Sequence, residues 1–480
     1  MPNIEQNIIK KIKILFVYVN PLRIPYLDLG IASLSAYLKP QGYQTKLIDF
    51  TFNSNINNAI NELKKYNPEI VCFSSRTGEF NDVVKIAKIF KKNHQALYLC
   101  GGIHPTISPE EAITQECFDG ICVGEGELAL LDLVNKLENK ESYHNTKGFW
   151  FRYNDKIIKN PLNQLICDLD ELPTIDYDLF DIDKYLKIRC GQLDYVSARG
   201  CPFLCAYCVN HQLIKINKGL GTYSRRKSAG KIISEVKKII KKYPQVKTLK
   251  IADEHFILDK ERLKKLAVDY KENGLPFECD VRADFCNEET MRLLKEMGCN
   301  KLNIAIESGD EELRNKFLNK RISNKQIIEA FKFAKKYKIH TMSFNIVGLP
   351  LETEEQIYKT INLNKLVEPD SIQASIFTPF KGTELYNFCK QNDLLLSNEI
   401  KNSYYEGEYL KNPYISNKKL NKIYKRFSYY CYKDRSKSKA YVLLLRDFMI
   451  PYYLKYRNYI PKIIIKGVYF IFLHFKFVSK

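Results

Sequence analysis

Three cysteines have the spacing that most clearly indicates chemistry in this chain. Cys201, Cys205 and Cys208 form a CxxxCxxC pattern on a short segment that begins with Gly200 and contains Pro202. Three thiolates on one compact loop can bind three irons of a [4Fe–4S] cluster and leave the fourth iron without a protein ligand. That open iron is available to a cofactor or a substrate. The spacing therefore predicts a cluster that takes part in a reaction.

A zinc site is the alternative interpretation of the same cysteines. His211 follows Cys208 at a spacing that would complete a Cys3His set, which is a common zinc coordination. The chain after His211 lacks the pattern of a zinc finger. A zinc-bearing or iron–sulfur-bearing protein that binds a partner or transfers electrons therefore remains a lesser alternative.

The cysteine motif, with the aromatic Tyr207 before its third cysteine, resembles the signature of the radical S-adenosylmethionine (SAM) superfamily. The resemblance implies that Cys201, Cys205 and Cys208 carry the catalytic cluster. It also implies that SAM chelates the open iron through its amino and carboxylate groups. An electron from a reducing partner such as flavodoxin or ferredoxin would then cleave SAM to a 5′-deoxyadenosyl radical.

The same resemblance assigns a set of residues to SAM binding, most of them near the ends of predicted strands: Tyr207, Asp253, Glu254, Arg282, Glu307, Ser308, Arg321, Gly348 and Pro350. Asp253 and Glu254 match the acidic motif that meets the SAM ammonium. The two arginines are expected to pair with the SAM carboxylate, because a guanidinium binds carboxylates bidentately. Ordinary ion pairs are their alternative role. His255 is interpreted as a packing or orienting residue.

Two other pairs of this set are assigned to the rest of the SAM molecule. Glu307 and Ser308 correspond to the family's contacts with the ribose and the methionyl group, whereas Gly348 and Pro350 correspond to its contacts with the adenine.

The elements around these residues alternate between extended and helical patterns. The strand before the cysteines is followed by predicted strands at 246–252, 276–283, 301–309, 340–350 and 371–380, with helix-length segments between them. Six strand–helix units predict a partial (β/α)6 barrel, whose site lies at the carboxyl ends of the strands.

The N-terminal third shows a second alternating pattern. Short apolar runs at 13–19, 43–49, 69–75, 96–102 and 119–127 are separated by helix-length segments, which predicts a doubly wound parallel sheet. Small residues in the loops after these strands allow a large planar or phosphate-bearing ligand to approach the backbone. Neither GxGxxG nor GxxxxGK[ST] occurs, so the motifs that usually indicate binding of a nicotinamide cofactor or ATP are absent from the sequence.

The order of the two predicted domains resembles the cobalamin-binding branch of the radical SAM superfamily. The resemblance implies that the N-terminal sheet binds cobalamin through its loops, and the expected residues are Ser74, Ser75, Arg76, Gly101, Gly102, His104, Gly124 and Gly126. The DxHxxG motif is absent, and the matching region begins with Asn20 and Pro21. A cobalamin without a protein histidine on cobalt is therefore implied.

This branch implies radical methylation. Methylcobalamin would donate a methyl group to an unactivated carbon or phosphorus centre of a small-molecule or natural-product-like substrate, and a second SAM would restore it. The alternative within the branch is a cyclase or rearrangement enzyme that does not methylate.

Length and composition are consistent with a folded multidomain protein. The 480 residues carry a net charge of +20, 45% hydrophobic residues and 14 Cys. The expected α/β domains are 1–145 (cobalamin-binding-like) and 191–385 (radical SAM partial barrel), joined by a linker at 146–190 and followed by a mostly helical region at 386–480. The opening residues lack an apolar signal-peptide core, so a reducing cytoplasm is expected.

The last forty residues are basic and aromatic, with seven Lys or Arg, one acid and eleven Phe or Tyr. Lys462, Lys466 and Lys476 interrupt every apolar run before it reaches the roughly 18 residues needed to span a bilayer. A packed helical cap is favoured over an element that lies on a membrane surface. Nucleic-acid binding is disfavoured because no RNA-binding module is visible.

Overall fold

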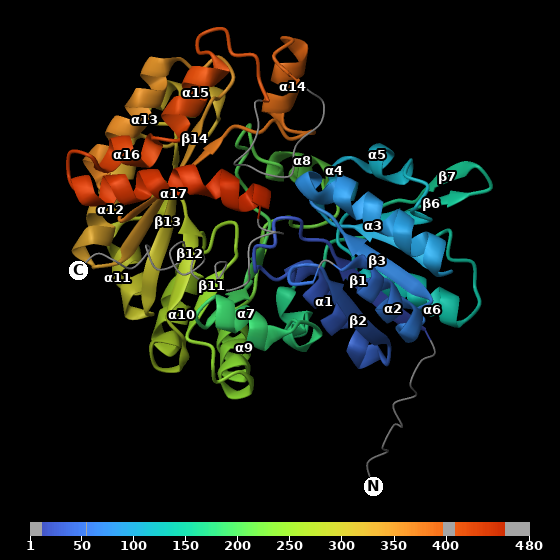
Figure 1. The fold of residues 1–480 in the computed structure, drawn as a ribbon. Helices are drawn as coiled ribbons and strands as arrows, with labels where there is room; N and C mark the ends of the chain where they lie inside the picture. Colours follow the sequence, from blue (N-terminus) through green and yellow to red (C-terminus); the bar gives the residue numbers. More distant parts are fainter. Residues whose placement is uncertain (1–11, 54, 397–408, 457–480) are drawn as a thin grey trace. The chain divides into compact units, whose positions relative to one another are not determined.

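The computed structural model describes residues 12–53, 55–396 and 409–456 (Figure 1). The chain divides into two compact units. One consists of Met1–Asp183 and Gln212–Arg225, and the other of Lys184–His211 and Arg226–Lys480.

The first unit contains a seven-stranded sheet in the order β2-β1-β3-β4-β5-β6-β7. Its strands are β1 (Lys13–Tyr18), β2 (Gln44–Asp49), β3 (Ile70–Ser74), β4 (Leu97–Gly101), β5 (Gly120–Cys122), β6 (Phe149–Tyr153) and β7 (Lys156–Lys159). The first five strands are parallel. Its helices are α1 (Leu29–Leu38), α2 (Ile56–Tyr66), α3 (Phe80–Asn93), α4 (Ile103–Ile107), α5 (Pro109–Ile113) and α6 (Glu127–Glu138). The predicted parallel α/β sheet is thus confirmed.

The central strand β1 is buried on both faces, as expected for a parallel sheet covered by helices on each side. Leu15 and Val17 pack into one cluster with Phe73 and Phe90, while Ile14 and Phe16 are also buried. Side-chain caps set where the helices begin. The Asp28 carboxylate accepts a hydrogen bond from the backbone of α1, and Asn55 does the same for α2.

Strands β6 and β7 lie within the segment expected to be a linker. They form an antiparallel hairpin that extends the sheet beyond β5. Asn154 and Asp155, between the two strands, both have positive φ angles of 46° and 56°, as a two-residue hairpin turn requires. The sequence FWFRY-ND-KIIK contains this hairpin pattern, two strand-like runs joined by a two-residue turn. The pattern was missed because the preceding chain alternates between helices and strands.

The second unit contains a curled, all-parallel half-barrel in the order β15-β14-β13-β12-β11-β8. Its strands are β8 (Gln192–Tyr195), β11 (Thr248–Ile251), β12 (Phe277–Val281), β13 (Cys299–Glu307), β14 (His340–Val347) and β15 (Ser371–Ile376). Its helices are α9 (Ala229–Lys242), α10 (Lys260–Asn273), α11 (Glu288–Glu296), α12 (Asn324–Lys336), α13 (Glu354–Val367) and α14 (Glu384–Gln391). The expected partial six-stranded barrel is confirmed.

Four shorter elements complete the middle of the chain: α7 (Ile182–Ile188), β9 (Ala198–Arg199), α8 (Asn210–Ile216) and β10 (Arg225–Arg226). A single helical stretch was expected before β14. Instead, a π-helical turn at Leu313–Phe317 is separated from α12 by a loop. Asn319 and Arg321 in that loop have positive φ angles, which no continuous helix allows.

The barrel strands alternate between an outer face that contacts helices and an inner face that carries polar groups. In β12, Phe277, Cys279 and Val281 are buried on the outer face, and Glu278 and Asp280 between them are partly exposed on the inner face. Because the side-chain period of a strand is two, this alternation sets which residues line the inside of the half-barrel.

The C-terminal helices α15 (Asn417–Tyr424), α16 (Phe427–Tyr432) and α17 (Lys437–Tyr456) pack outside β15 and α13 (Figure 1). Leu420 and Phe427 belong to one apolar cluster with Ile361 and Ile376. None of the helices in the described part of the chain is long and apolar enough to cross a membrane. Residues 457–480, which hold most of the basic aromatic tail, lie outside the described residues.

Gly309 provides a test of how closely α13 approaches β13. A Cβ atom at this position would lie 2.3 Å from the Lys359 carbonyl oxygen and 2.5 Å from the Thr360 Cα. Gly309→Ala is therefore expected to destabilise the protein by about 1–3 kcal/mol through overpacking. Thermal unfolding followed by circular dichroism measures the loss.

Gly230→Ala in α9 is the matched control. The nearest atom to a Cβ there is 3.9 Å away, and alanine favours helix, so this variant should be neutral or slightly more stable. Equal melting temperatures for the two variants would contradict the packing argument.

Candidate radical SAM site

The three cysteines lie in the loop that follows β9, at the carboxyl end of the first barrel strand. Gly200 starts the loop with a φ of 81°, and the Cys208 amide donates a hydrogen bond to the Cys205 carbonyl at 3.0 Å. Cys205 is buried, whereas Cys201 and Cys208 are partly exposed. Burial raises the pKa of Cys201 to about 11. Positive charge is therefore needed near these thiols if they are to act as thiolates.

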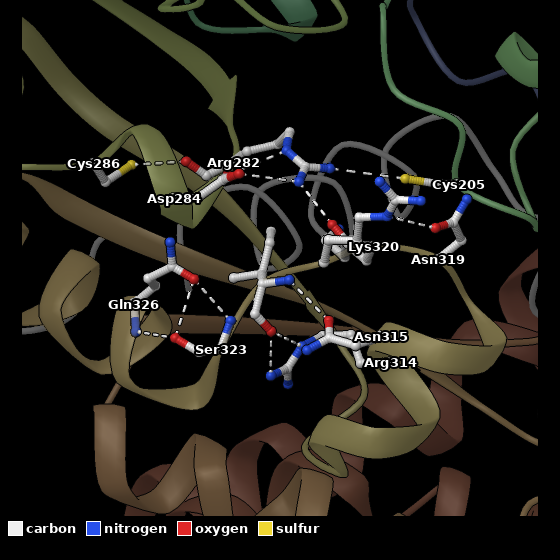
Figure 2. A network of polar contacts seen from close by, with 12 residues as sticks. Cys205, Arg282, Asp284, Cys286, Arg314, Asn315, Asn319, Lys320, Ser323 and Gln326 are labelled. Carbon is white, nitrogen blue, oxygen red and sulfur yellow. Dashed lines mark hydrogen bonds and ion pairs between the residues drawn. The ribbon is translucent and has the colours of Figure 1, made fainter.

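Arg282 supplies part of that charge (Figure 2). Its Nη1 lies 3.8 Å from the Cys205 Sγ, and its plane lies over the Phe203 ring with the guanidinium carbon 3.7 Å from the ring centroid. Nε and Nη2 donate to the two Asp284 carboxylate oxygens at 3.2 and 3.1 Å, and Nη2 also donates to the Lys320 carbonyl. The guanidinium is thus engaged by the protein at the cluster loop. This differs from the expected pairing of Arg282 with the SAM carboxylate.

Lys320 is the second cation of the site, and no motif in the sequence indicated it. Its Nζ lies 3.1 Å from the Glu307 carboxylate and 3.3 Å from the Tyr207 hydroxyl, which itself donates to Glu307 at 2.9 Å. Burial raises the pKa of Cys208, while Asn210 and Lys320 act in the opposite direction. Lys320 therefore joins the cysteine loop to the end of β13.

Asp253 and Glu254 have different environments although they are adjacent. Asp253 is fully buried, and its two oxygens accept hydrogen bonds from the Ser197 amide at 2.6 Å, the Ser197 hydroxyl at 2.5 Å and the Ala198 amide at 3.0 Å. Burial raises the pKa of Asp253, and Arg262 opposes that rise. These contacts argue against a direct role for Asp253 with the SAM ammonium.

Glu254 is exposed and accepts a hydrogen bond from the Gly200 backbone, at the start of the cysteine loop. Of the two adjacent acids, Asp253 is thus enclosed by the protein and Glu254 is exposed beside the cysteine loop. The expectation that one of them meets the SAM ammonium stays a prediction, and the exposed Glu254 is the residue that we test for it.

His255 follows directly and lies between aromatic rings. Its ring stacks at 5.7 Å from Phe203 and meets Phe285 edge-on at 4.6 Å, measured between centroids. Burial, together with Arg282, lowers the pKa of His255 to about 3, so the ring is neutral. The packing role expected for this residue agrees with these contacts.

The remaining SAM-assigned residues are Ser308 and Arg321, described here, and the pair Gly348 and Pro350, described below. Ser308 is fully buried, its hydroxyl accepts a hydrogen bond from the Asp310 amide, and its carbonyl accepts one from Arg314. Arg321 is exposed and donates to the Asn319 side chain at 3.0 Å, and Asn319 in turn donates to the Leu204 carbonyl of the cysteine loop at 2.8 Å. The pairing of Arg321 with the SAM carboxylate stays a prediction.

Gly348 and Pro350 form the turn after β14, where Gly348 has a φ of 72°. Glu352, which the sequence analysis did not single out, closes this turn. Its Oε2 accepts hydrogen bonds from the Gly348 amide at 2.6 Å and the Leu349 amide at 3.1 Å. Burial raises the pKa of Glu352 from its ordinary value of 4.5 to about 8, despite these two hydrogen bonds.

The three cysteines of the loop fit an iron–sulfur cluster, because each cysteine of a [4Fe–4S] cluster binds a different iron. Within the described residues no group of three or more His, Cys, Asp or Glu side chains forms a site for a single metal ion. His211, the fourth ligand of the zinc alternative, instead pairs through Nε2 with Glu384 at 3.2 Å.

In the first unit, the loops after β3 and β4 are bonded to each other. The Ser75 amide donates to the Gly101 carbonyl, and the His104 amide donates to the Ser75 carbonyl. A Cβ on Gly102, whose φ is 99°, would lie 2.8 Å from the Ser75 oxygen, so only glycine allows this approach. Together with Ser74, these small residues lie at one edge of the sheet, as the loops of a planar-ligand site should.

The other cobalamin-assigned residues surround this edge. His104 is buried with its ring 3.9 Å from that of Phe80, which is a packing position within the domain. Arg76 is exposed and is fixed by the Tyr18 hydroxyl at 3.0 Å and by Glu79. The Gly124 amide donates to the Thr106 hydroxyl, and Gly126 packs near Leu34.

Two family models match the chain. The B12 binding domain model matches residues 17–134, and the Radical SAM superfamily model matches residues 195–363. The chain therefore contains a B12 binding domain followed by a radical SAM domain. It is a radical SAM enzyme with a B12 binding domain, and its cofactors are a [4Fe–4S] cluster, SAM and cobalamin.

Curated relatives of this radical SAM enzyme match most of its length. An uncharacterized methyltransferase of Pyrococcus horikoshii is 29% identical and covers 94% of this chain and 91% of its own. Cytidylyl-2-hydroxyethylphosphonate methyltransferase of Streptomyces wedmorensis is 21% identical over 75% and 77% of the two chains. The anaerobic magnesium-protoporphyrin IX monomethyl ester cyclase of Cereibacter sphaeroides is 24% identical over 74% and 59%.

Solved structures share the fold. The cobalamin-dependent SAM radical enzyme OxsB, with aqua-cobalamin and SAM bound, has a TM-score of 0.72 and 18% identity, with 98% of this chain and 76% of that chain covered. The radical SAM methyltransferase TsrM of Kitasatospora setae, with cobalamin and a [4Fe–4S] cluster bound, has a TM-score of 0.67 and 16% identity over 79% and 75%.

The different environments of the two acidic residues predict different variants. Glu254→Gln should leave the cluster intact and weaken SAM binding about tenfold, because it removes the charge that faces the ammonium. Asp253→Asn should instead lower the melting temperature, because an amide cannot accept all three hydrogen bonds. Equilibrium SAM binding to the reconstituted protein, with iron analysis, distinguishes the two. Unchanged SAM affinity in Glu254→Gln would refute the assignment.

Glu352 predicts a pH-dependent stability. Between pH 4.5 and about 8 the unfolded chain loses this proton while the folded chain keeps it, so the free energy of unfolding falls as the pH rises. Glu352→Gln keeps the acceptor for Gly348 and removes the proton. The variant should therefore gain stability over the wild type by at most about 1.4 kcal/mol per pH unit within that window.

Urea unfolding at pH 5, 6, 7 and 8 measures this difference. Glu355→Gln, an exposed glutamate of α13, is the control that should change little. A constant difference between Glu352→Gln and the wild type across these pH values would contradict the prediction.

Proposed function

We propose that this enzyme is a cobalamin-dependent methyltransferase that methylates an unactivated carbon or phosphorus centre of a small molecule. The observation that carries the proposal is the presence, in one chain, of a B12 binding domain and of a barrel with a three-cysteine loop. Two relatives are named as methyltransferases, which supports the proposal.

The bound cofactors supply a 5′-deoxyadenosyl radical from SAM at the cluster and a methyl group from cobalamin. The residues of the chain bind and orient them. Cys201, Cys205 and Cys208 hold the cluster, and Arg282 beside Cys205 offsets thiolate charge. Glu254 orients the SAM ammonium.

Two further features of the site support radical chemistry. Phe203, Phe285 and the neutral His255 form a cluster of three rings beside the cysteine loop, and we propose that this apolar cluster limits water there. Excluding water protects reactive intermediates from side reactions. For the B12 binding domain we propose a cobalamin without a protein histidine on cobalt, supported by the absence of the DxHxxG motif and by the packing of His104 on Phe80.

The proposal includes a reducing partner such as flavodoxin or ferredoxin and a reducing compartment such as the cytoplasm. None of the fourteen cysteines forms a disulfide, and an open cluster is sensitive to oxidants. A non-methylating cyclisation remains the second candidate, supported by the relative that is named as a cyclase.

The test is anaerobic turnover with SAM deuterated in its methyl group. The reconstituted enzyme, a chemical reductant and a metabolite extract should give a product heavier by the label, with S-adenosylhomocysteine and 5′-deoxyadenosine both formed. Both are expected because one SAM donates the methyl group and another is the source of the radical. The variant in which Cys201, Cys205 and Cys208 are all alanine should lose its iron and form neither by-product.

Deoxyadenosine without S-adenosylhomocysteine would favour the cyclase alternative. Zinc in place of iron in the anaerobically reconstituted protein would refute the proposed radical SAM function.

A further inference from the structure

Three polar residues lie on the inner face of the half-barrel below the cysteine loop. Lys250, Asp280 and Asn303 come from the neighbouring strands β11, β12 and β13. Asp280 precedes Arg282 by two residues and therefore lies on the same face of β12. Two residues of a strand span about 7 Å, so this group lies one layer of side chains below Arg282.

The three residues form one hydrogen-bonded group. Asp280 Oδ1 accepts from Lys250 Nζ at 2.6 Å and from Asn303 Nδ2 at 2.7 Å. In the described part of the chain the buried Asn303 Oδ1 has no partner, and Asp280 Oδ2 takes no part in either of these two bonds. Asn303 is only 4% exposed, whereas the Asp280 side chain is 38% exposed. Both unused atoms are acceptors.

The surrounding charges do not supply the missing donors. Lys250 is 3.9 Å from Glu278, and Lys301 is 3.5 Å from the same carboxylate. Burial lowers the pKa of Lys250, but Asp280 and Glu278 outweigh it and raise the pKa, so the amine stays charged. Each lysine is thus held by a carboxylate. The two lysines and two acids balance in charge, yet Asn303 Oδ1 still has no hydrogen-bond partner among the described residues.

A buried acceptor without a donor is unfavourable, and a bound molecule can remove this cost. A molecule that brings N–H or O–H groups would satisfy Asp280 and Asn303 together. A carboxylate or a hydrocarbon chain would leave Asn303 unpaired, and a carboxylate would also meet the charge of Asp280. Sites built in this way reject ligands that lack the matching polar group.

We propose that Asp280 and Asn303 bind the substrate of this enzyme, and that the substrate presents amine or hydroxyl donors to them. This inference rests on the proposed function, since it identifies the substrate class of the same site. Lys250 acts as a positioning residue that holds Asp280 Oδ1, and so leaves Oδ2 directed to the ligand.

The experiment uses the reconstituted holoenzyme with cluster, cobalamin and SAM, and without reductant, so that no turnover occurs. Three probes of equal chain length are 1,4-diaminobutane, butane-1,4-diol and succinate. Saturation-transfer NMR measures their dissociation constants. The diamine, the diol or both should bind, and succinate should not. Preference for the diamine indicates an ammonium substrate, and preference for the diol indicates a hydroxyl substrate.

Two variants test the assignment to residues. Asp280→Asn should weaken binding of the preferred donor probe about tenfold or more, because it replaces a charged acceptor. Asn303→Leu should also weaken it. Asp269→Asn, an exposed residue of α10 on the outside of the barrel, is the matched control and should leave probe binding unchanged. Cluster absorbance and SAM affinity verify that each variant is folded.

Binding of succinate as tight as that of the donor probes, no binding of either donor probe, or unaltered binding in both folded variants would overturn the inference. The labelled-methyl assay is independent of this one. Absence of methyl transfer with normal donor-probe binding would refute the proposed methyltransferase function alone.

Discussion

Three anionic thiolates have to be held close together on one partly buried loop, and the rest of the barrel site is arranged around this constraint. Burial disfavours the thiolate form, so the loop requires cations that are themselves fixed. Arg282 comes from the end of β12 and Lys320 from the loop before α12. Each is held by a carboxylate, Asp284 or Glu307, and by further hydrogen bonds. The positive charge at the cluster is therefore a property of three separate segments of the chain.

The parallel arrangement of the strands makes this possible. All carboxyl ends of the half-barrel lie at the same edge, so Tyr207 can donate to Glu307 although the two are 100 residues apart in sequence. The same alternation that directs Glu307 and Arg282 to the cysteine loop directs Asp280 and Asn303 to the inside of the barrel, one layer lower. The residues around the cysteine loop and the proposed substrate-binding residues thus lie on one face of the sheet.

In the B12 binding domain, contacts between separate loops also determine which residues lie at the edge of the sheet. Its loops contain glycines because neighbouring backbones approach closely there: Gly102 touches Ser75 and has a φ of 99°. This close approach leaves an edge of small side chains. His104 is used for packing against Phe80, which is consistent with a domain that binds its ligand without a histidine on the metal.

The sequence by itself determined what depends on short spacing. The CxxxCxxC motif, the strand–helix alternation of both domains and the acidic pair after β11 are all local patterns, and the alternation correctly predicted the two parallel sheets. The hairpin of β6 and β7 was missed although its Asn154-Asp155 turn was visible, because the preceding alternation favoured a linker.

Only the tertiary structure decided which members of a pattern reach the site. Asp253 and Glu254 are chemically equivalent in the sequence, but the contacts of Ser197 turn one into a structural residue. Lys320, Glu352 and the unused acceptors of Asp280 and Asn303 had no signal at all. Their roles depend on burial and on partners from distant strands, and neither quantity is encoded in the spacing of neighbouring residues.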